Sequence, residues 1–256
     1  MVHNASPTEQ RQGVTSGAAV PPAVRQLVLA SASPRRHELL QVLGASFRVL
    51  ITNGEEQSDN PPEAIVALLP PCPVPLDTHP TLLAWRKAQA ACAEAPDSVI
   101  IGADTIVVLD GLVLGKPRDA AHAHAMLTQL AGRVHTVYTG VVVLHPTDSA
   151  QPPAVTLELA ASDVTIAPLT SDEIEAYIAT GEPMDKAGAY GIQGLGGQLV
   201  RAVAGSYTCV VGLPITLTHR LLVQAGIPAL RDPTEAYYDW VHAQGKEPLP
   251  CPPTFP

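Results

Sequence analysis

Short apolar segments alternate with helix-like segments along most of the chain, and this alternation constrains the fold more than any other feature. Leu27 to Ala30 form a run typical of a short buried strand. Ser33 and Pro34, which follow, are residue types favoured at the N-cap and first position of a helix. Further strands are predicted at 99–103, 106–109, 112–114, 134–144, 155–167, 198–203 and 207–211, and further helices at about 82–94, 119–130, 170–181 and 214–224. The alternation predicts one α/β domain with a mixed sheet flanked by helices.

The 256-residue chain is long enough for one large α/β domain with a substantial core. We expect this domain to span 27–230, between a flexible tail at 1–26 and a C-terminal extension at 231–256. The proline-dense stretch at 58–81 is expected to be a surface loop or insertion with a short helix near 63–69.

The formal net charge of −9 argues against non-specific binding to nucleic acid or to a membrane surface, since both require a basic face. An anionic small molecule would need a local cluster of positive groups or a metal ion. The apolar runs are shorter than the roughly 18 residues of a membrane span. Residues 1–24 lack the apolar core of a signal peptide, so we expect a cytoplasmic protein without a membrane partner.

The segment from Ser31 to Arg36 lies between a predicted strand end and a predicted helix start. Backbone N–H groups and the helix dipole favour an anion at such a place. The hydroxyls of Ser31 and Ser33, with the guanidinium groups of Arg35 and Arg36, could bind a polyphosphate. An ordinary capped helix with solvated arginines is the competing interpretation.

Asp104 directly follows the predicted strand 99–103, where functional groups of α/β sheets tend to lie. A carboxylate there could hold a metal ion or take a proton from water. The competing interpretation is an aspartate that begins a turn. Glu55 and Glu56 offer further carboxylates, although such acidic pairs are common on solvated surfaces.

Three lysines and one glutamine complete the candidate residues. Lys87, Lys116 and Lys186 could each simply face solvent, but with the arginines they supply the positive groups that an acidic protein needs to bind phosphate. Gln193 is the amide within the glycine-rich segment 188–197, which lacks the context of a dinucleotide-binding fingerprint. Glycines allow a close backbone approach, so this segment is either a flexible loop or a loop that recognises a base.

In their order along the chain, these segments resemble the Maf family of nucleotide pyrophosphatases. The matching motifs are LASASPRRHELL at 29–40, GEEQ at 54–57, IGADTIVVLDGLVLGKPRDA at 101–120, MLTQLAGRVHTVYTGV at 126–141, GEPMDKAGAYGIQGLGG at 181–197 and GSYTCVVGLPI at 205–215. The resemblance spans about 27–226. It implies a single domain similar to inosine triphosphate pyrophosphatases, with an elongated mixed sheet and a central cleft between two lobes.

The resemblance also implies an activity, which is hydrolysis of a nucleoside triphosphate to the monophosphate and pyrophosphate with Mg²⁺ or Mn²⁺. The family's catalytic acid/base falls on Asp104, and one of its further polar site residues falls on Glu56. We expect Asp104 and Glu56 to hold the metal ion together with phosphate oxygens. The polar residues expected to bind phosphate are Ser31, Arg36, Lys87, Lys116 and Lys186, with Asp185 as an alternative to the last.

The dTTP/UTP-cleaving branch of the family is marked by positions that match Arg35, Thr105 and Gln193. Gln193 has a physical rationale, because uracil and thymine present a carbonyl, an N–H and a carbonyl. One glutamine amide supplies both a donor and an acceptor to that edge.

Two features of the chain depart from the family pattern. The proline-rich stretch 58–81 lengthens the spacing from Glu56 to Lys87, and Ala131 stands where the family usually has serine.

Two alternative functions stay open, which are the removal of modified or non-canonical nucleotides and a non-catalytic nucleotide-binding role in regulating cell division. A homodimer is an expectation from the resemblance alone.

Overall fold

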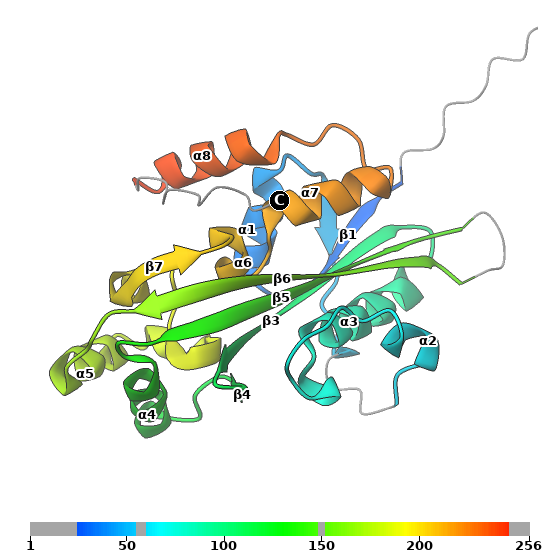
Figure 1. Ribbon diagram of the computed structural model, residues 1–256. Helices are drawn as coiled ribbons and strands as arrows, with labels where there is room; N and C mark the ends of the chain where they lie inside the picture. Colours follow the sequence, from blue (N-terminus) through cyan, green and yellow to red (C-terminus); the bar gives the residue numbers. More distant parts are fainter. Residues whose placement is uncertain (1–24, 55–59, 148–151, 246–256) are drawn as a thin grey trace, which may run out of the picture.

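A seven-stranded mixed sheet forms the centre of the molecule in the computed structural model, which describes residues 25–54, 60–147 and 152–245 (Figure 1). The strands are β1 (Leu27–Ala30), β2 (Phe47–Val49), β3 (Val99–Leu109), β4 (Leu112–Leu114), β5 (Val134–His145), β6 (Ala154–Ile166) and β7 (Val200–Ala204). Their order is β2-β1-β3-β5-β6-β7, with β4 paired to β3. β1 is parallel to β2 and β3, whereas β3 is antiparallel to β4 and β5, as β6 is to β5 and β7. The predicted α/β class and mixed sheet are therefore confirmed.

Helices flank both faces of this sheet. They are α1 (Pro34–Val42), α2 (Glu63–Val66), α3 (Pro80–Glu94), α4 (Ala120–Leu130), α5 (Ser171–Ala179), α6 (Tyr207–Val211), α7 (Ile215–Gln224) and α8 (Pro233–Ala243). Short 3-10 helices occur at η2 (Leu76–Thr78), η3 (Glu182–Asp185), η4 (Ala187–Ala189) and η5 (Leu195–Leu199). Among the described residues, none of the helices is both long enough and apolar enough to cross a membrane.

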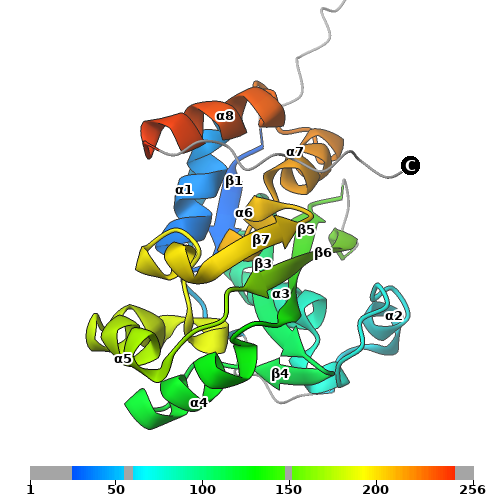
Figure 2. The same cartoon turned by 60° about the vertical axis from the view of Figure 1, so that its left-hand side comes forward.

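The two faces of the sheet carry separate hydrophobic clusters, because successive side chains of a strand point to opposite faces. Val28 and Ile100 pack with the alanines of α3 on one face. Leu29 and Ile101 belong to a larger cluster that also includes residues of α1 and of α4 to α8. Figures 1 and 2 place α4 and α5 at one end of the long strands, away from α7 and α8.

Most of the predicted elements are present, and their local signals are visible in the structure. Asp110 and Gly111 both have positive φ in the turn from β3 to β4, as expected for an Asp-Gly hairpin turn. Thr170 and Glu173 form a capping box at the start of α5, where a helix is predicted to begin. The short helix expected near 63–69 is α2.

Two of the strand predictions are wrong. Residues 99–103 and 106–109 form one continuous strand, since the backbone of β3 pairs with β5 through Asp104 and Thr105 whatever their side chains. Residues 207–211 form α6 rather than a strand. Their composition favours a strand, but the Ser206 hydroxyl caps the backbone N–H of Cys209 at 3.2 Å and starts a helical turn.

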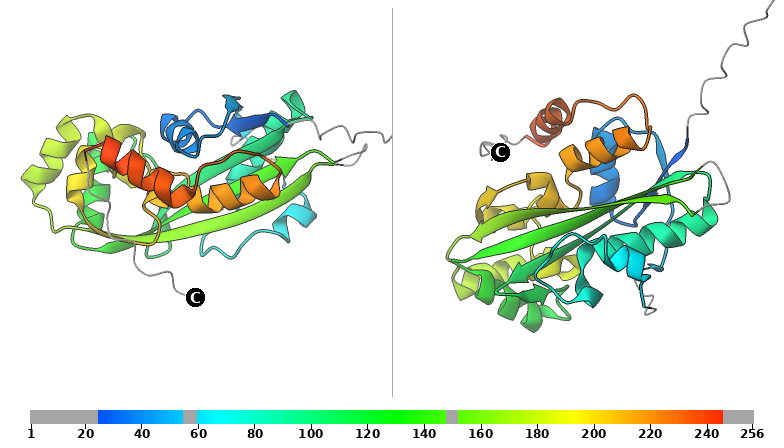
Figure 3. Two further views of the ribbon diagram at one scale, coloured as in Figure 1. Left: turned by 90° about the horizontal axis from the view of Figure 1, so that it is seen from above. Right: turned by 45° about the vertical axis from the view of Figure 1, so that its right-hand side comes forward.

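The sequence patterns also missed β2 and α8. Ala236, Trp240 and Val241 of α8 are buried in the main hydrophobic cluster, and the Trp240 indole N–H donates to the Glu38 carboxylate at 2.7 Å. Figure 3 shows α8 lying beside α1 and α7. The tail predicted at 1–26 lies almost entirely outside the described residues. Residues 55–59, which include the first two residues of the proline-rich stretch, and 246–256 of the C-terminal extension also lie outside them.

Candidate active site

A break in the pairing along one edge of β3 creates the candidate active site. β5 pairs with one edge of β3 from Ile100 to Val108. On the other edge, β1 pairs up to Gly102 and β4 pairs from Val107 onward. Within the described ranges, the ladders thus leave residues 103–106 without a partner strand on that edge. Ala103 and Ile106 of this stretch are buried, whereas Asp104 and Thr105 are partly exposed and line a cavity.

Asp104 lies in this break and faces α3. Its carboxylate accepts a hydrogen bond from the Lys87 ammonium at 2.7 Å, and the two side chains are 14% and 11% exposed. An ion pair this close to the protein interior is screened by solvent less than a surface pair. The contact therefore fixes the direction in which the Asp104 carboxylate points.

Small residues let α3 come close enough for this ion pair. Ala84, Ala88 and Ala91 of α3 are fully buried against the sheet. A Cβ atom on Gly102 of β3 would clash with the Ala84 carbonyl oxygen, and one on Gly140 of β5 would clash with the backbone at Thr81. Glycine at these strand positions therefore permits the approach that brings Lys87 to Asp104.

Thr105 points to the opposite face of the sheet from Asp104 and lies under Arg36. The Arg36 Nε donates to the Gly212 carbonyl at 2.9 Å, and its Nη2 donates to the Thr105 hydroxyl at 3.1 Å. The Thr139 hydroxyl donates to the Cys209 carbonyl at 2.8 Å, so its contact of 2.9 Å with Thr105 requires Thr105 to be the donor. The Thr105 proton is thus directed away from Arg36, and its oxygen orients the guanidinium.

The start of α1 brings hydroxyl and backbone groups to the same place. Ser31 follows β1 directly and is buried, and its hydroxyl accepts from the Ser33 backbone N–H at 3.2 Å and from Arg36 Nη1 at 3.4 Å. Ser33 is the N-cap of α1, as predicted. The positive end of the helix dipole and the Arg36 charge therefore face the same space.

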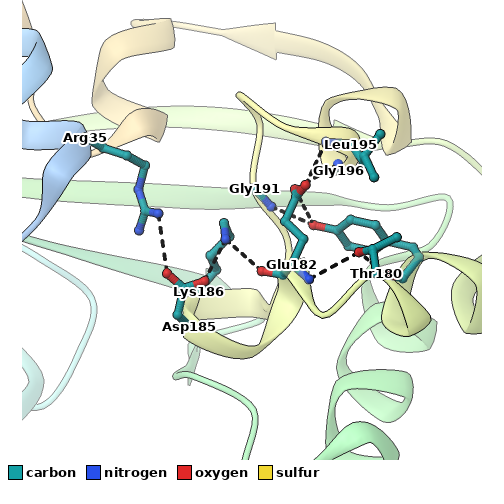
Figure 4. A network of polar contacts seen from close by, with 9 residues as sticks. Arg35, Thr180, Glu182, Asp185, Lys186, Gly191, Leu195 and Gly196 are labelled. Atoms are coloured by element: carbon teal, nitrogen blue, oxygen red, sulfur yellow. Dashed lines mark hydrogen bonds and ion pairs between the residues drawn. The ribbon is translucent and has the colours of Figure 1, made fainter.

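The segment after α5 lies across from α1 and contributes a second group of charges (Figure 4). The Lys186 ammonium contacts the Asp185 carboxylate at 2.6 Å, and Arg35 lies 3.7 Å from the other Asp185 oxygen. The hydrogen bond from Lys186, together with the charges of Lys186 and Arg35, holds the pKa of Asp185 below its usual value. Asp185 thus connects one predicted phosphate-binding residue to one predicted specificity residue.

One cavity of about 600 Å³ collects these groups, a volume in the range of small-molecule sites. The predicted site residues that line it are Ser31, Arg35, Arg36, Lys87, Asp104, Thr105, Lys116, Lys186 and Gln193. Asp185 lines it as well. Glu56, the other predicted metal ligand, lies outside the described residues.

Three side chains that the sequence patterns did not single out support this site. Thr139 completes the chain of hydroxyls below Arg36, while Tyr177 and Glu182 contact the glycine-rich segment that carries Gln193. The sequence contains one indication of these contacts, which is the density of glycines in 191–197. Glycines allow other groups, here the side chains of Tyr177 and Glu182, to approach the backbone closely.

Comparison with known proteins places these features in a family. The family described as Maf-like protein matches residues 26–225. A dTTP/UTP pyrophosphatase of Shigella boydii serotype 4 is 47% identical over 207 residues, which cover 80% of this chain and 95% of that protein. Proteins of the same name from Yersinia pestis bv. Antiqua and Moorella thermoacetica are 50% identical over 197 residues and 48% identical over 202 residues. They cover 77% and 79% of this chain, and 91% and 96% of their own lengths. This chain belongs to the Maf-like protein family.

Proposed function

We propose that this protein hydrolyses dTTP and UTP to the nucleoside monophosphate and pyrophosphate with the help of a divalent metal ion. The observation that carries the proposal is a cavity in which basic, hydroxyl and carboxylate side chains from distant segments converge. Relatives that share 43–50% of their residues with this chain are named dTTP/UTP pyrophosphatases. The formal net charge of −9 makes this local positive cluster a specific feature rather than a general property of the surface.

Phosphate binding is assigned to the basic groups that border the cavity. Arg36 is held by three hydrogen bonds, and Lys87 by its ion pair with Asp104. Lys116 follows β4 on the other side of the break in β3, and Lys186 lies on the segment after α5. Positive groups that are already oriented can stabilise the charge that builds on a leaving pyrophosphate without reorganising during the reaction.

Asp104 is assigned the role of general base. In this reaction a water oxygen forms a bond to the α-phosphorus, and the bond to the oxygen that bridges the α- and β-phosphates breaks. The electron pair of that bond leaves with pyrophosphate, and Asp104 accepts the proton of the water. Its location in the break of β3 gives the carboxylate access to the cavity while Lys87 fixes its direction.

The donor set in the cavity suits Mg²⁺ or Mn²⁺. Such ions are commonly held by one or two carboxylates together with substrate phosphates, and Asp104 supplies one carboxylate. Within the described residues, groups of three or more His, Cys, Asp or Glu side chains that could hold a metal ion do not occur. As the sequence predicts, we assign the ion to Asp104, Glu56 and the phosphate oxygens. When bound, the ion would neutralise phosphate charge and polarise the α-phosphorus.

Base selection is assigned to Arg35, Thr105 and Gln193. The amide of Gln193 can donate to a uracil or thymine carbonyl and accept from the N3–H group. Thr105 acts through Arg36, whose guanidinium it orients. Arg35 is positioned by Asp185 on the opposite side of the cavity.

Pyrophosphate release from dTTP, UTP, CTP, GTP, ATP and 7-methyl-GTP, measured with Mg²⁺ and with a chelator, tests the proposal. We expect metal-dependent cleavage that is fastest for dTTP and UTP. Faster cleavage of a purine nucleotide would disprove the assignment of base selection. Absence of cleavage in a folded sample would disprove the catalytic role and favour a binding protein.

The variant Asp104→Asn tests the role of the carboxylate. It keeps the size of the side chain but removes the base, so we expect turnover to fall by about 10²–10⁴-fold while the fold is retained. The control is Asp110→Asn, because Asp110 lies at the end of the same strand with a side chain that is 68% exposed. Near-normal turnover of Asp104→Asn would contradict the assignment.

A further inference from the structure

The carboxylate of Glu182 binds the glycine-rich loop that carries Gln193 (Figure 4). Its Oε2 accepts a hydrogen bond from the Leu195 backbone N–H at 2.8 Å, and its Oε1 accepts one from the Gly196 N–H at 3.1 Å. Both backbone groups lie just after Gln193 in the chain. One carboxylate therefore fixes the C-terminal side of the loop.

Tyr177 of α5 fixes the other side of the same loop. Its hydroxyl donates to Glu182 Oε1 at 2.9 Å and accepts from the Gly191 backbone N–H at 3.1 Å. Tyr177 is 5% exposed, so its hydroxyl has little access to water as an alternative partner. Gln193 is thus bracketed by backbone groups that are held by these two side chains.

The glycines of the loop are explained by the close approach of the same two side chains. A Cβ atom on Gly194 would clash with the Glu182 carboxylate, and one on Gly196 would clash with the Tyr177 hydroxyl. A Cβ atom on Gly191 would lie 3.1 Å from Glu182 Oε1 and 2.5 Å from a carbon of Lys186. The loop backbone is therefore packed onto Glu182 and Tyr177 rather than being free to move around them.

The hydrogen bonds of Glu182 require its ionised form. Burial acts to raise the pKa of Glu182, but the backbone amides, the Tyr177 hydroxyl and the charge of Lys186 outweigh it and lower the pKa below its usual value. An ionised carboxylate is an acceptor only. All three of its partners are donors, so the network is satisfied without ambiguity.

Glu182 also connects the loop to the phosphate-binding side of the cavity. Its backbone carbonyl accepts from the Lys186 ammonium at 2.7 Å. Lys186 in turn contacts Asp185, which lies near Arg35. Glu182 thus contacts both the loop that carries Gln193 and the predicted phosphate-binding residue Lys186.

We propose that Glu182, together with Tyr177, is a positioning residue for base selection. The two side chains hold the Gln193 amide where it can form hydrogen bonds with the uracil or thymine edge. This inference rests on the proposed function, since it assigns a use to the base-recognising loop. The Glu182 carboxylate is occupied by its contacts with Leu195, Gly196 and Tyr177, and the Glu182 backbone carbonyl contacts Lys186.

The variant Glu182→Gln tests this role while keeping the shape of the side chain. Whichever way the new amide is turned, its NH₂ group faces a backbone N–H of Leu195 or Gly196, and that group loses its acceptor. We expect the preference for UTP over CTP in kcat/KM to fall by roughly tenfold, which is the effect of one unsatisfied buried group. The change should appear mainly in the KM for UTP, because the base is remote from the reacting phosphorus.

Two further variants separate this role from a general structural one. Tyr177→Phe removes the hydroxyl between Gly191 and Glu182, so it should lower the same preference. Its effect should not add fully to that of Glu182→Gln, since both belong to one network. Glu175→Gln is the matched control on α5, because Glu175 is exposed and its carboxylate contacts the Ser171 hydroxyl at 3.3 Å. An unchanged UTP-to-CTP ratio in Glu182→Gln, or an equal loss for all nucleotides, would overturn the proposal.

Calorimetric binding of α,β-imido-UTP and α,β-imido-CTP makes the inference independent of turnover. The unaltered protein could bind the uridine analogue preferentially and yet release no pyrophosphate from UTP. In that case the catalytic function is refuted, but the ratio of the two analogues' affinities for Glu182→Gln still tests the positioning role. A smaller ratio in the variant supports the positioning role, and an equal ratio refutes it. If the unaltered protein shows no preference between the analogues, the positioning role is refuted as well.

Discussion

Replacing Gly102 with alanine tests whether the close packing of α3 on β3 is what assembles the Lys87–Asp104 ion pair. The added methyl group would clash with the Ala84 carbonyl oxygen and would lie 3.1 Å from the Ala88 Cβ atom. Ordinary contact between such atoms is about 3.5–4.0 Å. The contact with Ala88 therefore requires α3 to move by about 0.5 Å, and the contact with the Ala84 oxygen requires about 1 Å.

A movement of this size affects both stability and catalysis. Overpacking of a close-packed interior lowers the free energy of unfolding by about 1–3 kcal/mol. Lys87 lies next to Ala88 on α3, so its ammonium would move from 2.7 Å to beyond hydrogen-bonding distance from the Asp104 carboxylate. A misplacement of about 1 Å in a catalytic group can lower the rate by about 10²-fold.

Urea denaturation and pyrophosphate release from UTP measure these two effects on the same samples. The control is Gly115→Ala, because a Cβ atom at Gly115 would meet no neighbouring atom within 4 Å. We expect the control to stay within twofold of the unaltered protein in turnover. Full stability and full turnover of Gly102→Ala would refute the argument that glycine at this strand position sets the helix–sheet distance.

Three other predictions follow from buried contacts. Burial lowers the pKa of His135 from 6.5 to about 4, so the unfolded state binds the proton first as the pH falls. The free energy of unfolding should therefore be about 2 kcal/mol lower at pH 5 than at pH 7.5. If the free energy of unfolding of His135→Gln fell by the same amount between these pH values, His135 would not be the cause. Trp240→Ala should lower the free energy of unfolding by about 3–5 kcal/mol, because the indole is buried and bonded to Glu38; a change below about 1 kcal/mol in urea denaturation would show that α8 contributes little. Thr105→Val removes the acceptor of Arg36 Nη2 and should weaken UTP binding by about tenfold, whereas Thr105→Ser should keep it; equal affinities of the two variants in calorimetry would disprove the role of the hydroxyl.

Local features of the fold could be predicted from the sequence, because their causes lie within a few residues. The N-cap at Ser33, the capping box at Thr170 and the turn at Asp110 depend on neighbouring backbone groups, and each is present. The wrong prediction at 207–211 was also local in origin. The composition of 207–211 favours a strand, but a single cap at Ser206 decides for a helix.

The sequence by itself determined the class of the domain, its helix caps and turns, and the chemical types of the candidate site residues, since these follow from residue identity and short spacings. The tertiary structure alone decided how those residues meet. Asp104 is accessible because β1 and β4 pair with different parts of one edge of β3, and Lys87 reaches it because Gly102 lets α3 approach. The role of Glu182 depends on a loop folded back onto its carboxylate. Strand order and close packing join residues that are far apart in the chain, and neither is encoded in a local pattern.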